Sequence, residues 1–207
     1  MTLVETLVVV AIISLLASLL LPVFAGARES GRQTRCIANL RQLGQATWLY
    51  LADYDDLFPY GLDVMDRLHP EQWLGRANPL TGESYHAQVL ALIAAHPTAT
   101  NVESVLAPYY AATREVWRCP SDRGRADVSG GRPLFEAVGS SYFYRTELAL
   151  SHVSLPALPR PSEANLLADA SAWHRKGPPS AALLYTDGHI RGVGPAGYLA
   201  ALRTPLF

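Results

Sequence analysis

Three acidic side chains in the stretch "DYDD" form the first pattern that points to chemistry. Asp53, Asp55 and Asp56 offer carboxylate oxygens, which are the ligands that Ca²⁺ prefers in proteins. Their spacing begins like an EF-hand loop, but Phe58 and Val64 stand where such a loop needs glycine and glutamate. We therefore expect a solvated acidic helix end here, with no metal or cofactor, and keep calcium as the alternative.

A second group of polar side chains lies nearer the carboxyl end. His174, Asp169, Asp187 and His189 have the residue types of a metal site or of an acid and base pair, if folding brings them together. However, Asp187 and Gly188 are typical of a two-residue type I′ hairpin turn, whose aspartate bonds its own backbone. The chain has no G-x-S-x-G, H-E-x-x-H or P-loop motif. We expect no catalytic residue and a chain that is not an enzyme.

The composition limits which partners the chain can attract by charge. Seventeen Lys and Arg residues oppose 18 Asp and Glu residues, which gives a formal net charge of -1. This balance provides no overall attraction to nucleic acids or anionic surfaces. One predicted loop holds Arg123, Arg125 and Arg132, too few for a DNA-binding patch, so a nucleic-acid partner is not expected. With 207 residues, 49% of them hydrophobic, the chain suits one globular domain plus an appendage.

The appendage is the amino-terminal segment, which is apolar enough to cross a membrane. Residues 7–27 contain no charged side chain, and a helix of that length spans roughly 30 Å of hydrocarbon. No basic residue precedes this run, which argues against a cleaved secretory signal peptide. Glu5 stands at its edge, where a lone carboxylate needs a partner such as the α-amino group of its own or a neighbouring copy.

This segment, "MTLVETLVVVAIISLLASLLLPVFAGARE", resembles the amino-terminal methylation segment of mature type IV pilins and pseudopilins. Thr2, Leu3 and Glu5 match the T-L-x-E pattern of those proteins, and Pro22 stands where pilins often carry a helix-loosening proline. The resemblance implies that a prepilin peptidase removes a leader, that Met1 is N-methylated, and that Glu5 pairs with a residue 1 amine during assembly. Met1 replaces the usual Phe, yet its spacing to Glu5 favours Met1 as the processed end.

We expect an α+β fold like a type IV pilin lollipop, with a long amino-terminal helix and a small antiparallel-sheet head packed on its carboxyl-terminal half. The chain divides into a hydrophobic helix at 1–28, an amphipathic continuation at 29–54 and a globular head at 55–207. The continuation is amphipathic because apolar and small side chains recur every three or four residues. These positions are Ile37, Leu40, Gly44, Thr47 and Leu51.

Periodicity and turn residues predict short elements within the head. Helices are expected at 85–96 and 101–112, the second with Asn101 as its N-cap and with Pro108 ending or bending it. Residues 117–133 are expected to form a loop because they are rich in Gly, Asp and Pro. Strands are expected at 141–148, 164–170, 182–186 and 189–193, and the last two form a hairpin.

Three blocks of the chain resemble one subgroup of pilin-like proteins, which carries a histidine, a spacer and an Asp-Gly pair near its end. The blocks are "CIANLRQLGQATWLYLADYDDLFP", "WRCPSD" and "RPSEANLLADASAWHRKGPPSAALLYTDGHI". His174 and Asp187 enclose twelve residues here, a longer spacer than is usual. The subgroup supports a pilin-like protein more than any particular task.

The two cysteines leave two interpretations open. Neither Cys36, in the expected helix, nor Cys119, in "WRCPSD", belongs to a C-x-x-C pair, so the spacing does not support a zinc site or a thioredoxin-like centre. They are either two separate buried thiols or one disulfide. Because the pilin-like segment implies export to an oxidising compartment, the disulfide is favoured, and it would join the head to the helix.

The pilin-like segment implies a structural subunit of an extracellular type IV pilus-like filament that polymerises through its hydrophobic helix. Such a subunit lies in the bacterial cytoplasmic membrane before assembly and on the cell surface afterwards. Its partners are further copies of itself, the prepilin peptidase, and the pilus or secretion assembly machinery. Two alternatives stay open: a type II secretion pseudopilin, and a membrane-anchored extracytoplasmic domain that binds or hydrolyses a ligand.

Overall fold

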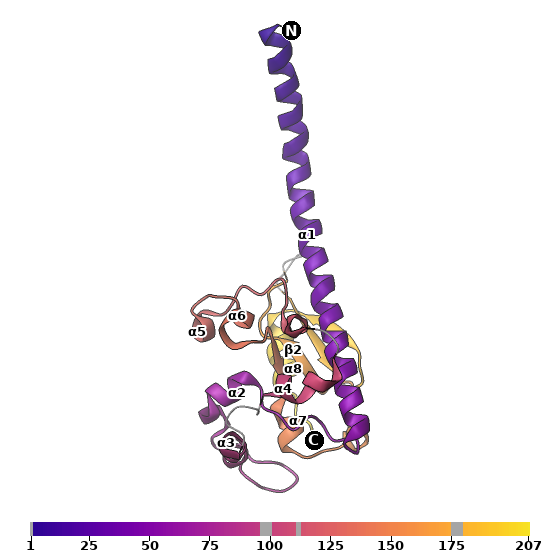
Figure 1. Ribbon diagram of the computed structural model, residues 1–207, viewed down its shortest axis with the longest axis vertical. Helices are drawn as coiled ribbons and strands as arrows, with labels where there is room; N and C mark the ends of the chain where they lie inside the picture. The colour runs from indigo at the N-terminus through magenta and orange to yellow at the C-terminus, as the bar shows by residue number, and fades with distance from the viewer. Residues whose placement is uncertain (1, 96–100, 111–112, 175–179) are drawn as a thin grey trace.

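One long helix dominates the molecule. The computed structural model describes residues 2–95, 101–110, 113–174 and 180–207. Helix α1, Leu3–Asp53, has 51 residues and stands upright on the rest of the chain (Figure 1). Thr2 caps its start and Tyr54 lies at its end, which matches the end expected near residue 54. Its buried positions begin at Glu29, so only the carboxyl-terminal half of α1 packs into the head.

A four-stranded antiparallel sheet lies beside this lower half of α1 (Figure 1). Its strands, in the spatial order β1-β2-β3-β4, are Tyr142–Tyr144, Asn165–Asp169, Ala181–Tyr185 and Ile190–Val193. Successive side chains of β3 point to opposite faces. Ala182 and Leu184 join the core that contains α1, while Leu183 joins a second core with helix α8 (Pro195–Arg203). The expected α+β lollipop, with a small antiparallel sheet on a long helix, is therefore confirmed.

The main core fills the space between α1 and the sheet. Leu40 and Leu43 of α1 pack with Leu166 and Leu184 of the sheet and with Trp117, and all five are fully buried. This arrangement agrees with the apolar stripe expected on the lower half of α1. Its buried members are Leu40, Gly44, Thr47 and Leu51, with Ile37 partly buried.

Short helices surround this core. They are α2 (Val64–Leu68), α3 (Tyr85–Ala95), α4 (Val102–Leu106), α5 (Ala126–Ser129), α6 (Leu134–Val138), α7 (Thr146–Leu150) and α8 (Pro195–Arg203). Single 3₁₀ turns lie at Pro70–Trp73, Ala107–Tyr109, Arg114–Trp117 and Leu155–Ala157. Asn101 precedes α4 as expected, but its side chain makes no capping hydrogen bond. Pro108 lies in the 3₁₀ turn that ends this segment, and the ends of both expected helices, at 96 and 111–112, lie outside the described residues.

Two expected elements of the head were wrong, and one helix was missed. The strand expected over 141–148 ends at Tyr144, where the Asp63 carboxylate accepts the Tyr144 backbone N–H and the chain turns into α7. The apolar pattern could not separate these elements because both are buried. The expected loop over 117–133 contains α5, and helix α8 was not anticipated. The signal for α8 was present, because Pro195 lies in its first turn and Arg203 in its last.

The β3–β4 hairpin is confirmed, but the type I′ turn is wrong. Backbone hydrogen bonds join Gly188 N–H to the Tyr185 carbonyl at 2.9 Å and Tyr185 N–H to the His189 carbonyl at 3.0 Å, which gives a three-residue loop. Gly188 has a positive φ of 95°, whereas Asp187 does not have the positive φ that a type I′ turn requires. The loop lies against Trp48, whose ring would come within 2.9 Å of a Cβ placed on Gly188.

Candidate functional site

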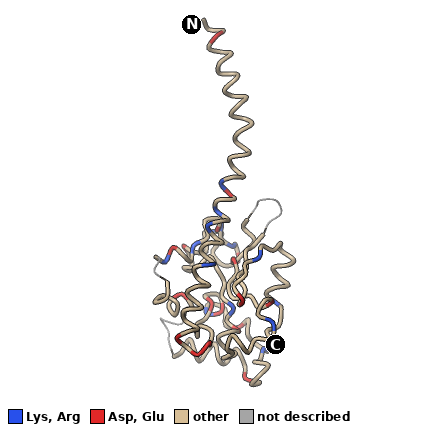
Figure 2. Tube along the Cα trace, turned by 90° about the vertical axis from the view of Figure 1, so that its right-hand side faces the viewer, with Lys and Arg blue, Asp and Glu red and all other residues tan. Residues whose placement is uncertain are grey.

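The upper half of α1 is an exposed apolar surface. Every large apolar side chain from Leu3 to Phe24 is exposed. Figure 2 shows one acidic position near the amino terminus and then no charged residue until the helix approaches the head. Among the described residues, α1 is the one helix that is long and apolar enough to cross a membrane. Exposed apolar surface of this extent marks an interface with a membrane or with another protein.

Glu5 has a defined partner within its own chain. Its Oε2 accepts the Thr2 backbone N–H at 2.6 Å, and its own N–H donates to Thr2 Oγ1 at 3.3 Å. These two bonds form a capping box, which satisfies backbone donors that the first helical turn leaves free. The Thr-x-x-Glu spacing would have revealed this role from the sequence. Met1 lies outside the described residues, so the expected pairing of Glu5 with an amine and the N-methylation of Met1 stay predictions.

Pro22 lies inside α1, which continues through it as a helix. Proline has no N–H to donate to the carbonyl four residues earlier, which belongs to Ser18. The Ser18 hydroxyl bonds back to the Leu15 carbonyl at 2.7 Å. The expected loosening of the helix at Pro22 therefore stays a prediction about the molecule under load or in an assembly.

A disulfide joins the stalk to the head. Cys36 on α1 bonds to Cys119 in the segment after the Arg114–Trp117 turn, with their Cα atoms 4.9 Å apart and a sequence separation of 83. Both cysteines are buried. Of the two interpretations left open by the sequence, the disulfide is confirmed.

Two carboxylates and one histidine surround this disulfide. His174 Nε2 lies 4.0 Å from Cys119 Sγ and 3.0 Å from Asp169 Oδ2, while His174 Nδ1 lies 3.7 Å from Glu29 Oε1. His174 and Asp169 are fully buried, and Glu29 lies at the point where α1 enters the head. We call Glu29, Cys36, Cys119, Asp169 and His174 the junction cluster, because its members come from the stalk, a head loop and the sheet.

Within the junction cluster, His174 and Asp169 shift each other's pKa. Burial opposes protonation of His174, but its hydrogen bond to Asp169 and the charges of Asp169 and Glu29 outweigh burial and raise the pKa of His174. Burial raises the pKa of Asp169, against the lowering effect of His174. Glu29 also accepts the Ser121 hydroxyl at 2.8 Å. Glu29 therefore links the stalk to His174 and Ser121 of the head, while Asp169 pairs with His174 inside the head.

The structure separates the polar residues that the sequence placed together. Asp169 and His174 meet in the junction cluster, but Asp187 and His189 form their own pair on the exposed hairpin, with His189 Nδ1 2.7 Å from Asp187 Oδ1. The contact of Glu29 with His174 was not predicted from the sequence. An acid directly after a long apolar run was the available signal, but only the fold shows which head residue it meets.

The acidic stretch after α1 forms a turn. Asp55 and Asp56 adopt left-handed backbone with φ of 51° and 60°, and both are exposed. Asp53 accepts the Tyr109 hydroxyl at 3.0 Å. Among the described residues, these three acids are not a group close enough to share a metal ion.

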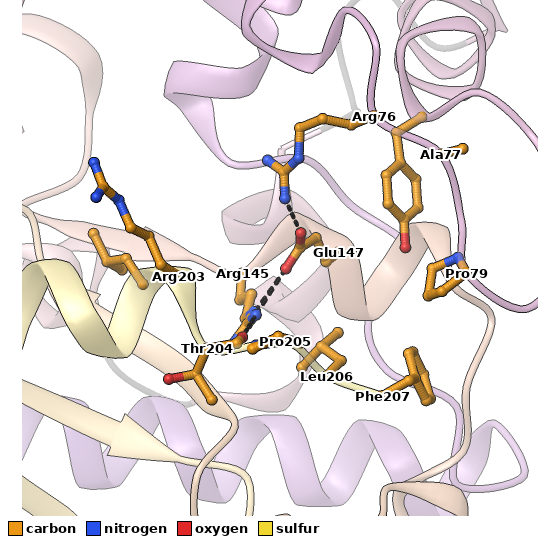
Figure 3. A pocket seen from close by; sticks show the side chains of 12 residues that line it. Arg76, Ala77, Pro79, Arg145, Glu147, Arg203, Thr204, Pro205, Leu206 and Phe207 are labelled. Atoms are coloured by element: carbon orange, nitrogen blue, oxygen red, sulfur yellow. Dashed lines mark hydrogen bonds and ion pairs between the residues drawn. The ribbon is translucent and has the colours of Figure 1, made fainter.

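A pocket of about 510 Å³, lined by none of the junction cluster residues, opens beside the carboxyl-terminal segment (Figure 3). Arg76 and the buried Arg145 both bond to Glu147, with Arg145 Nε 2.9 Å from Glu147 Oε2. Arg203 points away from this group (Figure 3). Because Glu147 already engages two arginines, the charged wall of the pocket connects α7 to the segment before α3.

Comparison with known families adds one result to this geometry. The sequence model of a family described as a protein of unknown function, DUF1559, matches residues 25–191. The chain belongs to the DUF1559 family. The DUF1559 match includes the lower stalk, the junction cluster and most of the sheet, and it begins where the apolar half of α1 ends. No curated protein and no solved structure matches the chain. DUF1559 membership together with the long apolar helix fits a pilin-like protein.

Proposed function

We propose that this chain is a structural subunit of a type IV pilus-like filament, held in the membrane by α1 before assembly and packed through α1 afterwards. The observation that carries the proposal is the division of α1 into a fully exposed apolar half and a half buried in the head. Exposure of apolar surface to water costs about 25 cal/mol per Å², so a copy whose upper half leaves the membrane must bury that half against other copies.

Glu5 sets the register in this proposal. A buried charge is costly unless it is paired, so a subunit that slips along its neighbours would leave the Glu5 carboxylate unpaired in an apolar core. The capping box occupies one carboxylate oxygen with Thr2 N–H, and the N-methylated amine of a neighbouring Met1 is the proposed partner of the carboxylate in the filament. Prepilin peptidase and an assembly machinery are further partners, and the head has a structural role rather than a catalytic one.

Substitution of Glu5 tests the filament proposal. Glu5→Gln keeps an acceptor for Thr2 N–H, because glutamine also completes a capping box, but it removes the charge. We expect Glu5→Gln to insert into the membrane as the parent does and to lose at least nine-tenths of the filaments counted by electron microscopy of shed material. Glu163→Gln, which removes an exposed head carboxylate, is the matched control and should assemble normally.

Three results would decide between the proposal and its alternatives. Normal filaments from Glu5→Gln would contradict a registration charge. Short periplasmic assemblies without shed filaments would indicate a type II secretion pseudopilin. Single copies that stay in the membrane, with residue 1 unmethylated by mass spectrometry, would indicate a membrane-anchored domain and would refute the filament role.

A further inference from the structure

The junction cluster contains a second kind of chemistry that the filament proposal does not use. Among the described residues, one group of His, Cys, Asp or Glu side chains is compact enough to hold a metal ion. It consists of the sulfurs of Cys36 and Cys119 and a ring nitrogen of His174, which lie within 4.8 Å of one another. All three residues are buried, so water does not compete for these positions as it does at a surface.

Asp169 lies outside this compact group of three, but it contacts the histidine of the group and could move in as a fourth donor once the sulfurs separate. Asp169 Oδ2 lies 3.0 Å from His174 Nε2, and Asp169 Oδ1 is buried without a hydrogen-bond partner. A buried carboxylate oxygen that lacks a partner is costly and is suited to accept a cation. His174 Nδ1 is buried without a hydrogen-bond partner, and Glu29 Oε1 lies 3.7 Å away, so a small approach would let Glu29 orient a metal-bound histidine.

We propose that the dithiol form of the junction cluster binds one zinc ion through Cys36, Cys119, His174 and Asp169. Two thiolates, an imidazole and a carboxylate are ligands that zinc takes in tetrahedral sites. In the disulfide form the two sulfurs are bonded to each other, so the zinc site exists only after reduction. The sequence spacing does not predict this zinc site, because the four ligands come from three separate segments.

Electrons and protons balance when the disulfide form of the junction cluster is converted to the zinc-bound dithiol form. A dithiol reductant donates two electrons and two protons to the Cys36–Cys119 disulfide and becomes a disulfide itself. The two free thiols then release their protons to solvent as zinc binds both thiolates. The reverse step needs a disulfide oxidant, which regains the electrons as the ion leaves.

Charge around the site favours a divalent cation. Two thiolates and Asp169 bring three negative charges to one buried point, and zinc neutralises two of them. Arg32 and Arg123 approach Glu29 at 3.6 Å and 3.9 Å, so the surrounding residues balance the charge that remains. The ion would connect α1, the Cys119 loop and β2, and would therefore replace the disulfide as the link between stalk and head where thiols are kept reduced.

Cobalt and zinc titrations test this site in the full-length chain, solubilised in detergent and free of any affinity tag. The chain is reduced with a dithiol, the reductant is removed without oxygen, and Co²⁺ is added. We expect one Co²⁺ per chain, with the intense thiolate-to-metal absorption and the visible bands of a tetrahedral site, and displacement by Zn²⁺. The oxidised chain should show none of these bands.

Variants separate coordination from mere folding. Cys119→Ser should remove the thiolate absorption, and His174→Gln should weaken Co²⁺ binding about tenfold or more and alter the visible bands. His189→Gln, which changes an exposed histidine of the hairpin, should bind as the parent does. X-ray absorption of the unsubstituted reduced zinc form should report two sulfur and two nitrogen or oxygen ligands, and this measurement depends on no variant.

Several outcomes would overturn the zinc site, and none of them concerns filament formation. They are an absence of thiolate absorption in the reduced chain, equal binding by the oxidised chain, unchanged Co²⁺ affinity in His174→Gln, and an absorption spectrum without sulfur ligands. A failure here would leave the proposed filament role intact, because that role depends on the exposed half of α1.

Discussion

Glu103 is a half-buried residue of α4 whose ionisation opposes folding. Its Oε2 is buried without a hydrogen-bond partner, and burial raises the pKa of Glu103 from 4.5 to about 7. Because the folded chain holds the proton more tightly than the unfolded chain, the free energy of unfolding falls as pH rises through the window from 4.5 to about 7. Glu103→Gln removes this dependence. Between pH about 4 and pH about 8, the stability of the variant relative to the parent should therefore rise by about 1 to 3 kcal/mol.

Thermal unfolding of both proteins, followed by tryptophan fluorescence at acidic and alkaline pH, checks the Glu103 prediction. The buried amide of the variant changes stability by the same amount at both pH values, so the difference between them isolates ionisation. Glu115→Gln, at an exposed side chain, is the control and should show no such difference. A parent and a Glu103→Gln variant whose stability difference does not change with pH would show that Glu103 ionises freely.

The residues of the candidate sites were predictable to different degrees. Glu5 could be named because its position beside an apolar run is a local pattern. His174 and Asp169 were also named, but the sequence grouped them with Asp187 and His189, which are close in the chain. Their true neighbour is Glu29 on α1. Such a contact between distant segments has no sequence pattern, because it depends on how the sheet sits against the helix.

Among the elements, the contact between α1 and β3 depends on Gly44. A Cβ placed there would lie 3.0 Å from Leu184 Cδ2 and 3.1 Å from the Trp48 ring, and Leu184 is fully buried. Gly44→Val should therefore lower the free energy of unfolding by about 1 to 3 kcal/mol through overpacking. Gly31→Ala is the matched control, since Gly31 is an exposed residue of α1 with nothing within 4 Å of its Cβ position.

Urea unfolding of the two glycine variants checks the α1–β3 contact. Gly31→Ala should stabilise the chain by up to about 1 kcal/mol, because alanine is the better helix former. If Gly44→Val is as stable as Gly31→Ala, the strand does not approach the helix as closely as described here.

Elements with strong periodicity or turn chemistry were predicted well, and short buried ones were not. The long apolar run and the stripe below it define α1 over 51 residues. Two short apolar runs around an Asp-Gly pair define the hairpin, although its turn is not the expected type I′. β1 and α7 follow each other with buried side chains throughout most of both elements, so no period separates them. Their boundary is set by the Asp63 carboxylate, which comes from a distant segment and accepts the Tyr144 N–H.

The chain is built in two parts that differ in what stabilises them. The upper half of α1 contributes no buried residue, whereas the head and lower stalk share a core and a disulfide that closes a loop of 83 positions. Such a cross-link contributes about 4.5 kcal/mol in the chain-entropy account, because it restricts the unfolded chain. The head should therefore keep its stability when the upper helix is removed, provided that the junction cluster stays covered.

Two truncations test this independence. Removal of residues 1–22 leaves about one and a half helical turns before Glu29, so fraying at the new end should not reach the junction cluster. This truncated chain should be soluble without detergent and should unfold at the same temperature as the full chain. Removal of residues 1–35 keeps Cys36 but deletes Glu29, which leaves His174 and Ser121 without their partner, and should cost about 1 to 3 kcal/mol. Equal losses from both truncations would show that the upper helix supports the head, and the separation of an assembling rod from a self-sufficient head would fail.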